Sequence, residues 1–181
     1  DLKKFGFLFQ GAALFDSLTL FDNVAFPLRE ERRPESEIEQ RVMEMLGLVD
    51  LTKARDKKPA ELSGGMRKRA GLARACVARP KYMLYDEPTT GLDPIRADNI
   101  NELILRMRDH LQVTGVAVTH DMTSAYKIAD RIALLHDGRI YAVGTPAEIQ
   151  GSTDPVVQQF IHGISDAKVK GEVPHGAAAN N

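Results

Sequence analysis

The chain has 181 residues, of which 43% are hydrophobic and 27% charged, a composition typical of a globular domain with a sizeable core. Its 24 basic and 25 acidic residues give a net charge of −1, which argues against a nucleic-acid partner because binding to phosphate backbones needs a basic surface. The single cysteine, Cys76, excludes an intramolecular disulfide, and no apolar run has the length of a membrane-spanning helix.

Apolar patterning at the start of the chain predicts a strand followed by helices. Residues 5–9 form an apolar run typical of a short buried strand, and Gln10 follows it directly. Residues 11–28 are apolar with interspersed turn residues, and residues 30–39 are charge-dense, as expected of a solvated loop that leads into a helix. From Ile38 the apolar residues recur at steps of three and four, which predicts a helix with one buried face.

A further helix and a central strand follow a polar linker at residues 53–60. Ser63 is a favourable N-cap, and Pro80 cannot continue a helix, so the pattern predicts a helix over residues 63–79. The continuous apolar run at residues 82–85 is typical of a central parallel strand.

The second half of the chain alternates between helix and strand. An amphipathic helix is predicted over residues 100–111, and a second buried strand over residues 115–119. The dipeptide Asp137-Gly138 signals a hairpin over residues 131–143. Short helices are predicted at residues 146–150 and 155–161.

This order of elements predicts an α/β fold with a parallel sheet covered by helices. Residues 29–79 interrupt the alternation, and we interpret them as a helical subdomain inserted into the α/β core. We expect residues 1–163 to form one domain. Residues 164–181 are rich in polar residues, glycine, alanine and asparagine, which predicts a disordered tail.

Two adjacent acids, Asp86 and Glu87, form a carboxylate pair at the end of the predicted central strand. The carboxyl end of such a strand faces the crevice where open α/β sheets bind ligands. One carboxylate can hold Mg²⁺ directly or through water, and the other can position or deprotonate an attacking water. A pair of solvated loop acids is the alternative interpretation.

Ser63, Gly64 and Gly65 form a serine–glycine motif at the start of the predicted helix. Glycines allow a phosphate to approach the backbone, the serine can donate to a phosphate oxygen, and the helix dipole attracts the anion. A turn before an ordinary capped helix is the alternative. The short helix and turn that separate this motif from the carboxylate pair favour the phosphate interpretation.

Two further polar residues follow predicted strands. Gln10 can contact a metal ion or a water at a strand end, and His120 can hydrogen-bond a terminal phosphate. A surface glutamine and an ordinary loop histidine are the alternatives. The other histidines show no metal-ligand spacing, so we assign no zinc or iron site.

In this order the motifs resemble the ATP-binding subunit of ABC transporters, over about residues 5–150. The matched positions are Gln10 (the Q-loop glutamine), Leu62 to Gly65 (the signature motif), Met83 to Glu87 (Walker B with its catalytic glutamate), Gly91 to Asp93 (the D-loop) and His120 (the switch histidine). The resemblance implies the parallel-sheet core of a P-loop NTPase (RecA-like), with ATP and Mg²⁺ as cofactors.

A narrower resemblance is to the ATPases of the maintenance-of-lipid-asymmetry (Mla) phospholipid systems. Residues 6–15, 21–30, 63–69 and 154–163 carry it, and Met66 stands where most ABC importers have glutamine. This resemblance implies transport of phospholipid between membranes. Amino-acid and lipoprotein-export ATPases share the Asn-Val-Ala-x-Pro-Leu pattern, so those substrates remain alternatives.

The family resemblance also implies roles for the matched residues. ABC ATPases form a head-to-tail homodimer, in which each ATP lies between one subunit's Walker A loop and the other's serine–glycine motif. Asp86 would order Mg²⁺ together with Gln10, partly through water. Glu87 would be the general base or would polarise the water, and His120 would sense the γ-phosphate. Asp93 would link the two sites.

The expected partners include an integral membrane permease that docks at about residues 11–30. Leu14, Phe15 and Phe21 are candidate contacts there, and packing in the core is the alternative for each. Further lipid-transport subunits are also expected, with the chain on the cytoplasmic side of the inner membrane. Non-transport ABC-type ATPases are the alternative class, but those usually carry long coiled coils or tandem cassettes.

One expected motif is absent from the 181 residues, namely the Gly-x-x-x-x-Gly-Lys-Ser/Thr phosphate-binding loop known as Walker A. The chain begins at Asp1 without an initiator methionine and without a signal-peptide pattern. We therefore expect an ABC ATPase that is incomplete at its N-terminus and inactive alone.

Overall fold

The computed structural model describes residues 4–163, which fall into two compact units, one before and one after the boundary between Ile128 and Ala129. The predicted domain over residues 1–163 and its helical part over 29–79 stay predictions, and the predicted tail over 164–181 lies outside the described residues. No helix within residues 4–163 combines the length and the apolar character needed to cross a membrane.

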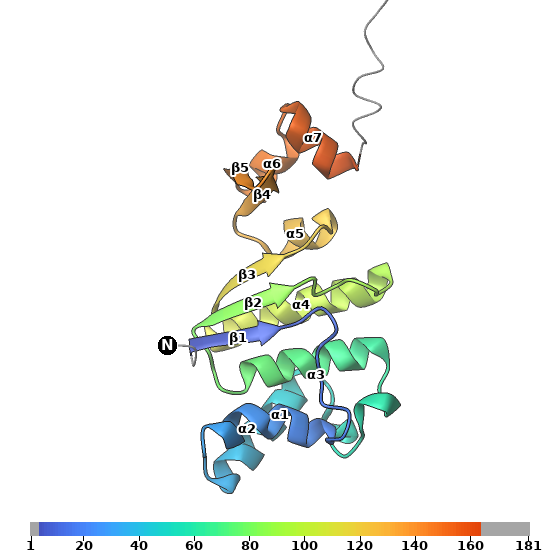
Figure 1. Ribbon diagram of the computed structural model, residues 1–181, viewed down its shortest axis with the longest axis vertical. Coiled ribbons are helices and arrows are strands. Elements are labelled where there is room, and N and C mark those ends of the chain that lie inside the picture. Colours follow the sequence, from blue (N-terminus) through green and yellow to red (C-terminus); the bar gives the residue numbers. More distant parts are fainter. Residues whose placement is uncertain (1–3, 164–181) are drawn as a thin grey trace, which may run out of the picture. The chain divides into compact units, whose positions relative to one another are not determined.

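The first unit contains a three-stranded parallel sheet in the order β1-β2-β3 (Figure 1). Its strands are β1 (Phe5–Leu8), β2 (Tyr82–Asp86) and β3 (Thr114–Val118). Leu8 pairs with Tyr85, and Asp86 pairs with Val118, so all three strands end at one edge. The prediction of a central parallel strand is confirmed by β2.

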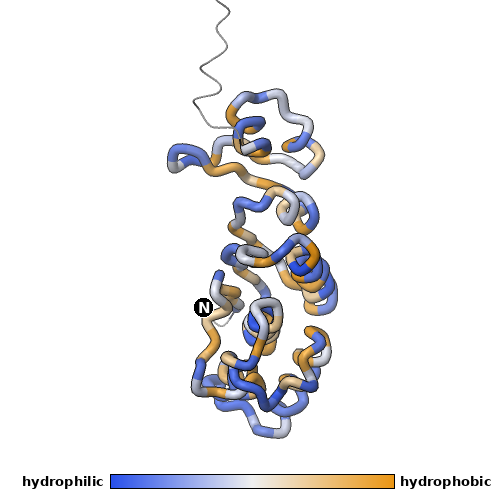
Figure 2. The backbone as a smooth tube through the Cα atoms, turned by 90° about the vertical axis from the view of Figure 1, so that its right-hand side faces the viewer, coloured by the Kyte–Doolittle hydropathy of each residue, from blue (hydrophilic) through white to orange (hydrophobic). Residues whose placement is uncertain are grey.

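Helices cover one face of this sheet and extend away from it (Figure 1). They are α1 (Leu20–Glu30), α2 (Glu35–Leu48), α3 (Gly64–Cys76), α4 (Pro94–Leu111) and α5 (Met122–Ile128), with short 3₁₀ turns η2 (Thr52–Ala54) and η3 (Pro59–Glu61). Hydrophobic and hydrophilic segments alternate along the chain, as expected of amphipathic elements (Figure 2).

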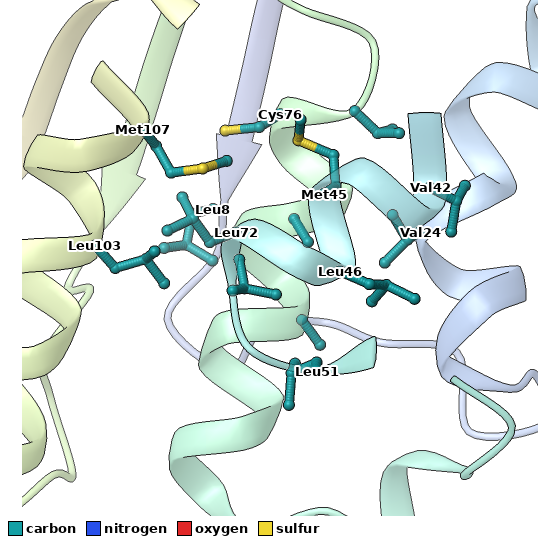
Figure 3. Close-up of a cluster of buried hydrophobic side chains, with 14 of the residues drawn as sticks. Leu8, Val24, Val42, Met45, Leu46, Leu51, Leu72, Cys76, Leu103 and Met107 are labelled. Carbon is teal, nitrogen blue, oxygen red and sulfur yellow. The ribbon is translucent and has the colours of Figure 1, made fainter. Parts of the chain in front are cut away.

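The core joins the covered face of the sheet to the helices. Leu8 from β1 lies beside Leu72 from α3, and Met107 from α4 lies close to them (Figure 3). On the other side of α3, side chains of α1 and α2 such as Met45 complete the cluster. Cys76 is fully buried within it, and burial raises the pKa of its thiol to about 12, which confirms its interpretation as a packed side chain.

Two predictions about the first unit were wrong. The loop predicted over residues 30–39 is shorter, because α2 already begins at Glu35. Helix α1, for which the sequence had predicted no element, forms because Thr19 caps it by accepting a hydrogen bond from the Asp22 amide and because Leu20, Val24 and Leu28 bury one face. This burial outweighs the presence of Pro27 inside the helix.

The strand predicted to be buried at residues 115–119 is β3, and all five of its residues are exposed. β3 is the edge strand of its sheet, and Val116 and Val118 are 57% and 64% exposed. β1 is likewise buried only at alternate positions, because helices cover one face of the sheet. Apolar runs therefore marked the strands correctly but overstated their burial.

The second unit, described over residues 129–163, is a hairpin followed by two helices. Strands β4 (Ile132–His136) and β5 (Arg139–Gly144) are antiparallel, and Asp137 and Gly138 both have positive φ, as a two-residue hairpin turn requires. The hairpin prediction is thus confirmed. So are the short helices, α6 (Pro146–Gln150) and α7 (Pro155–His162).

Candidate functional site

Gln10, the carboxylate pair and His120 follow the carboxyl ends of β1, β2 and β3. Because parallel strands end at the same edge of a sheet, this edge gathers the polar side chains of all three connections. The structure brings two of them into direct contact. The His120 Nδ1 atom lies 2.8 Å from the Glu87 Oε1 atom.

The second carboxylate oxygen of Glu87 is also occupied. The Thr90 hydroxyl donates to Oε2 at 2.8 Å, and the Thr119 hydroxyl donates to the same atom at 3.3 Å. The Glu87 side chain is only 19% exposed, whereas that of His120 is 74% exposed. The carboxylate is therefore held in one orientation, while the imidazole presents most of its ring to solvent.

The contact between Glu87 and His120 shifts both groups towards their charged forms. Burial alone would raise the pKa of the Glu87 carboxyl, but hydrogen bonds from His120 and Thr90 outweigh it and lower that pKa. The hydrogen bond to Glu87 raises the pKa of the His120 imidazole. With Nδ1–H donating to the carboxylate, the Nε2 atom is the ring nitrogen available to a ligand.

The backbone of Glu87 is also constrained. Glu87 has a φ of +46°, in the left-handed region that favours glycine. Its amide donates to the Val118 carbonyl at 2.9 Å, and its own carbonyl accepts a hydrogen bond from the Lys68 Nζ atom at 3.0 Å. Every polar group of Glu87 therefore has a partner within the chain.

Lys68, on α3, is a residue that the sequence predictions missed. Its side chain is 7% exposed. Burial lowers the pKa of its ammonium group, and the nearby carboxylates of Glu87 and Asp86 partly oppose that shift. The sequence contained a signal for the burial of Lys68, because this residue shares its helix face with Leu72 and Cys76 at steps of four, and both are buried.

A buried polar network lies next to His120. The Ser124 hydroxyl donates to the Asp121 Oδ2 atom at 2.6 Å, and Thr89 donates to the same oxygen at 3.2 Å. Asn101 of α4 donates to Ser124 at 2.9 Å. The network ties the segment after His120 to the segment after Glu87 and so fixes the two relative to each other.

The serine–glycine motif lies at the N-terminus of α3. Ser63 caps the helix by accepting from the Met66 amide at 3.3 Å. No atom outside the helix lies within 4 Å of where a side chain would start on Gly64 or Gly65, so the backbone there is accessible to a ligand. Within residues 4–163, no hydrogen bond links the motif to the carboxylate pair or to His120.

A cleft of about 370 Å³ adjoins the motif, between α3 and α4. Its basic lining residues are Arg69, Arg96 and Arg106, and its acidic ones are Asp50 and Glu102. Arginines near a helix N-terminus favour an anion.

The remaining predicted residues occupy separate positions. Gln10 is exposed in the turn after β1, and Asp86 is half-buried as the last residue of β2. Asp93 caps α4 by accepting from the Arg96 amide at 3.0 Å, and its carboxylate also forms an ion pair with Arg96.

Comparison with known proteins identifies the family. A family model described as ABC transporter matches residues 1–90. The chain is 43% identical over 173 residues to the intermembrane phospholipid transport system ATP-binding protein MlaF of Haemophilus influenzae. That match covers 95% of the chain and 66% of MlaF. The chain belongs to the ABC transporter ATPase family.

This ABC ATPase chain is similar to the ATP-binding proteins of more than one transport system. It is 46% identical over 160 residues to the probable ribonucleotide transport ATP-binding protein mkl of Mycobacterium bovis, covering 88% of the chain but 45% of mkl. It is 42% identical to MlaF of Escherichia coli K12, covering 96% of the chain and 65% of MlaF. The chain thus spans between about half and two thirds of the length of these relatives, and the resemblance to Mla ATPases is supported.

Solved structures confirm the fold of the ABC ATPase chain. One is cbiO1 from Clostridium perfringens, part of the ABC transporter complex cbiONQ, with a TM-score of 0.78 and 29% identity over 88% of this chain and 64% of cbiO1. Another is the ATP-binding cassette MJ0796 bound to ADP and Pi, with a TM-score of 0.70 and 33% identity over 79% of this chain and 63% of MJ0796. The prediction of an α/β, P-loop NTPase-like fold is therefore confirmed.

ABC ATPases bind ATP, typically with Mg²⁺, and the residues of this chain fit such an ion. Within residues 4–163 no three histidine, cysteine or acidic side chains converge to form a cage for a metal. Mg²⁺ does not need one, because it keeps several waters and takes one or two carboxylates together with substrate phosphates. Asp86 at the strand end and the amide oxygen of Gln10 are donors of that hard-oxygen kind.

Proposed function

We propose that this chain is part of the ATP-binding and ATP-hydrolysing subunit that powers an ABC transporter moving phospholipid between membranes. The proposal of ATP hydrolysis rests on the contact between Glu87 and His120 at the carboxyl ends of β2 and β3. The resemblance to two MlaF proteins over 95% and 96% of the chain supports phospholipid as the substrate class.

The geometry suits Glu87 to the activation of water. Its lowered pKa keeps it ionised at neutral pH, and its threonine and histidine partners fix the direction in which a lone pair points. We propose that Glu87 orients the attacking water and accepts its proton. His120 contacts the γ-phosphate through Nε2, on the ring edge opposite the carboxylate.

A bound Mg²⁺ would neutralise charge that develops on the transferring phosphoryl group. Asp86 and Gln10 are the residues that would hold it, directly or through water. Within residues 4–163, no hydrogen bond or ion pair engages the side chain of either residue, although the Asp86 carboxylate is near enough to the Lys68 ammonium to affect its pKa. Gln10 is exposed and Asp86 is half-buried.

The serine–glycine motif serves a different nucleotide. Because no hydrogen bond links it to Glu87, and its backbone faces open space, we propose that it binds the phosphates of ATP held by a partner subunit. The subunits form a head-to-tail homodimer. Asp93 lies at the start of α4 and links the two nucleotide sites.

The chain carries no phosphate-binding loop in its 181 residues, and we propose that it does not turn over ATP by itself. Isothermal titration of the chain with Mg-ATP, followed by a phosphate-release assay, tests this. We expect no steady-state hydrolysis. Sustained turnover that depends on Glu87 would overturn the proposal of inactivity and leave the proposed chemistry standing.

We propose that the permease docks at residues 11–30. Leu14 and Phe21 are half-buried against the core, whereas Phe15 and Phe26 are exposed, with their rings tilted by 49° and their centroids 4.8 Å apart. Phe15 and Phe26 are therefore the apolar anchors that this surface offers to a permease helix. Further lipid-transport subunits and a position on the cytoplasmic face of the inner membrane belong to the same proposal.

The decisive test is reconstitution in liposomes of the permease with a subunit that combines this chain and a phosphate-binding loop. We expect ATP hydrolysis that depends on Glu87, together with transfer of a fluorescent phospholipid between vesicles. Hydrolysis coupled to transport of another substrate, such as a ribonucleotide, would support the proposed ATPase activity and overturn the proposal that phospholipid is the substrate. No hydrolysis by a correctly assembled complex would overturn both.

A further inference from the structure

We propose that Lys68 is a positioning residue for Glu87. It acts through a single hydrogen bond from α3 to the Glu87 carbonyl. The proposal rests on the function proposed above for Glu87. Under this proposal α3, the helix that begins with the serine–glycine motif, stabilises the position of the water-activating Glu87 carboxylate in the same subunit.

Glu87 needs such a support because its backbone is strained. A residue with a β-carbon at positive φ crowds its own carbonyl, so this conformation is unfavourable and persists only where the surroundings impose it. Glu87 adopts φ +46° one residue after β2 ends. That conformation sets the direction in which the side chain leaves the strand.

Three hydrogen bonds to the backbone of Glu87 hold this conformation. The Glu87 amide donates to the Val118 carbonyl, which continues the pairing of β2 with β3. The Glu87 carbonyl accepts from the Thr90 amide at 3.3 Å, within the local turn, and from Lys68, nineteen residues earlier in the chain, at 3.0 Å. The bond from Lys68 is the shorter of the two to the carbonyl and the one that comes from another helix, so we assign to it the resistance to a return of Glu87 to an ordinary backbone conformation.

The burial of Lys68 indicates that this bond is specific. Lysine is rarely buried without a partner, because its ammonium group loses hydration. Lys68 is 7% exposed, and within residues 4–163 it forms no ion pair within 4 Å. Its hydrogen-bond partner is a neutral backbone carbonyl, so this bond depends on the position of the Glu87 backbone, while the carboxylates of Glu87 and Asp86 act on the ammonium at longer range.

Arg74, six residues further along α3, makes a parallel contact. Its guanidinium donates to the carbonyls of Ala12 and Ala13 at 2.8 and 2.7 Å. Both alanines have positive φ, of 62° and 47°, in the turn that contains Gln10. α3 thus holds left-handed backbone after β1 and after β2, and each of those connections carries a predicted site residue.

The test uses the 181-residue chain and measures the conformation of Glu87 directly. Nuclear magnetic resonance detects positive φ through a strong NOE between the amide and α protons of one residue. We expect Lys68→Met to weaken this NOE at Glu87 and to remove NOEs between Glu87 and His120. Lys68→Leu, which also lacks a donor, is measured alongside in case Lys68→Met does not fold.

Arg74→Met is the matched control on the same helix. We expect it to alter the signals of Ala12 and Ala13 and to leave those of Glu87 unchanged. Folded Lys68→Met or Lys68→Leu chains that retain the Glu87 NOE and the contact with His120 would overturn the proposal. Equal changes at Glu87 in the Arg74→Met variant would overturn it as well, because the effect would then be general loosening of α3.

Kinetics of the ATPase assembled with a phosphate-binding loop separate this proposal from the proposed function. Misplacement of a catalytic group by about 1 Å costs on the order of 10²-fold in rate, so we expect Lys68→Met to lower kcat about 10²-fold with little change in KM for ATP. An active parent enzyme with unchanged kcat in Lys68→Met would overturn the role of Lys68 alone. An inactive parent would overturn the proposed function, and the NOE measurement would still decide the backbone role of Lys68.

Discussion

The two regions proposed to act on ATP differ in how completely they are formed within one chain. At the edge of β2 and β3, both carboxylate oxygens of Glu87 already have partners. At the start of α3, the glycines of the serine–glycine motif face open space. The difference indicates that the chain fixes the geometry of the water-activating group in advance and leaves its anion-binding backbone available to an outside ligand.

The largest expected effect comes from removing the charge at the preformed region. In the assembled ATPase, Glu87→Gln should lower kcat by about 10²–10⁴-fold, because an amide cannot accept the proton of the attacking water. ATP binding, measured by isothermal titration, should be retained. Asp109→Asn, at an exposed acid on α4, should leave kcat unchanged. Near-normal hydrolysis in Glu87→Gln would exclude the proposed role.

The buried network beside His120 should make the preformed region sensitive to a small deletion. Ser124→Ala removes a hydroxyl that bonds Asp121 and Asn101, and unsatisfied buried groups cost about 1–3 kcal/mol. We expect a loss of that size in the free energy of unfolding, measured in urea. Ser17→Ala, at an exposed position, should have almost no effect. Equal free energies of unfolding in the two variants would show that the network does not contribute to the stability of the fold.

The open region should respond through binding more than through folding. Ser63→Ala removes the cap of α3, and Thr19→Ala removes the cap of α1, so each should cost about 1 kcal/mol in the free energy of unfolding. Only Ser63→Ala should also weaken ATP-dependent dimerisation, measured by analytical ultracentrifugation of the assembled ATPase. If Thr19→Ala weakened dimerisation as much, the motif would have no special part in it.

The smallest expected effect is the pH dependence of the contact between Glu87 and His120. The raised pKa of His120 gives stabilisation that is complete below its ordinary value of 6.5 and lost as pH rises through the folded value. The lowered pKa of Glu87 gives stabilisation that is complete above 4.5 and lost as pH falls through the folded value. Both contributions are therefore complete between pH 4.5 and 6.5.

This window can be measured by following the His120 imidazole protons during a pH titration. We expect Glu87→Gln to lower the pKa of His120, since the amide offers no charge to stabilise the imidazolium. His110, which contacts Glu44 at 3.3 Å, is an internal reference that this substitution should not affect. An unchanged His120 titration would mean that the contact is absent in solution.

The sequence predicted best where a local signal and the tertiary structure agree. Ser63 caps α3 as expected, and the apolar run at 82–85 is the central strand. In each case one residue type or one period determines the local structure, so no knowledge of distant segments is needed.

The sequence predicted less where burial depends on residues far away. β3 has the composition of a buried strand, but whether Val116 is covered depends on what packs on its sheet. The helical spacing of Lys68 with Leu72 and Cys76 indicates a buried position, but nothing in the sequence identifies the partner of its ammonium group, a carbonyl nineteen positions later. The positive φ of Glu87 has no local signal either, because glutamate does not favour it.

The burial of Cys76 has a practical consequence for site-specific labelling of this chain. Its thiol is enclosed by the core, and its raised pKa keeps it protonated at neutral pH, so maleimide reagents should not react with it. A cysteine introduced at Phe15 would then be the one reactive thiol, without any need to replace the native one. A fluorophore attached there would report on the surface of residues 11–30 in an otherwise unaltered chain.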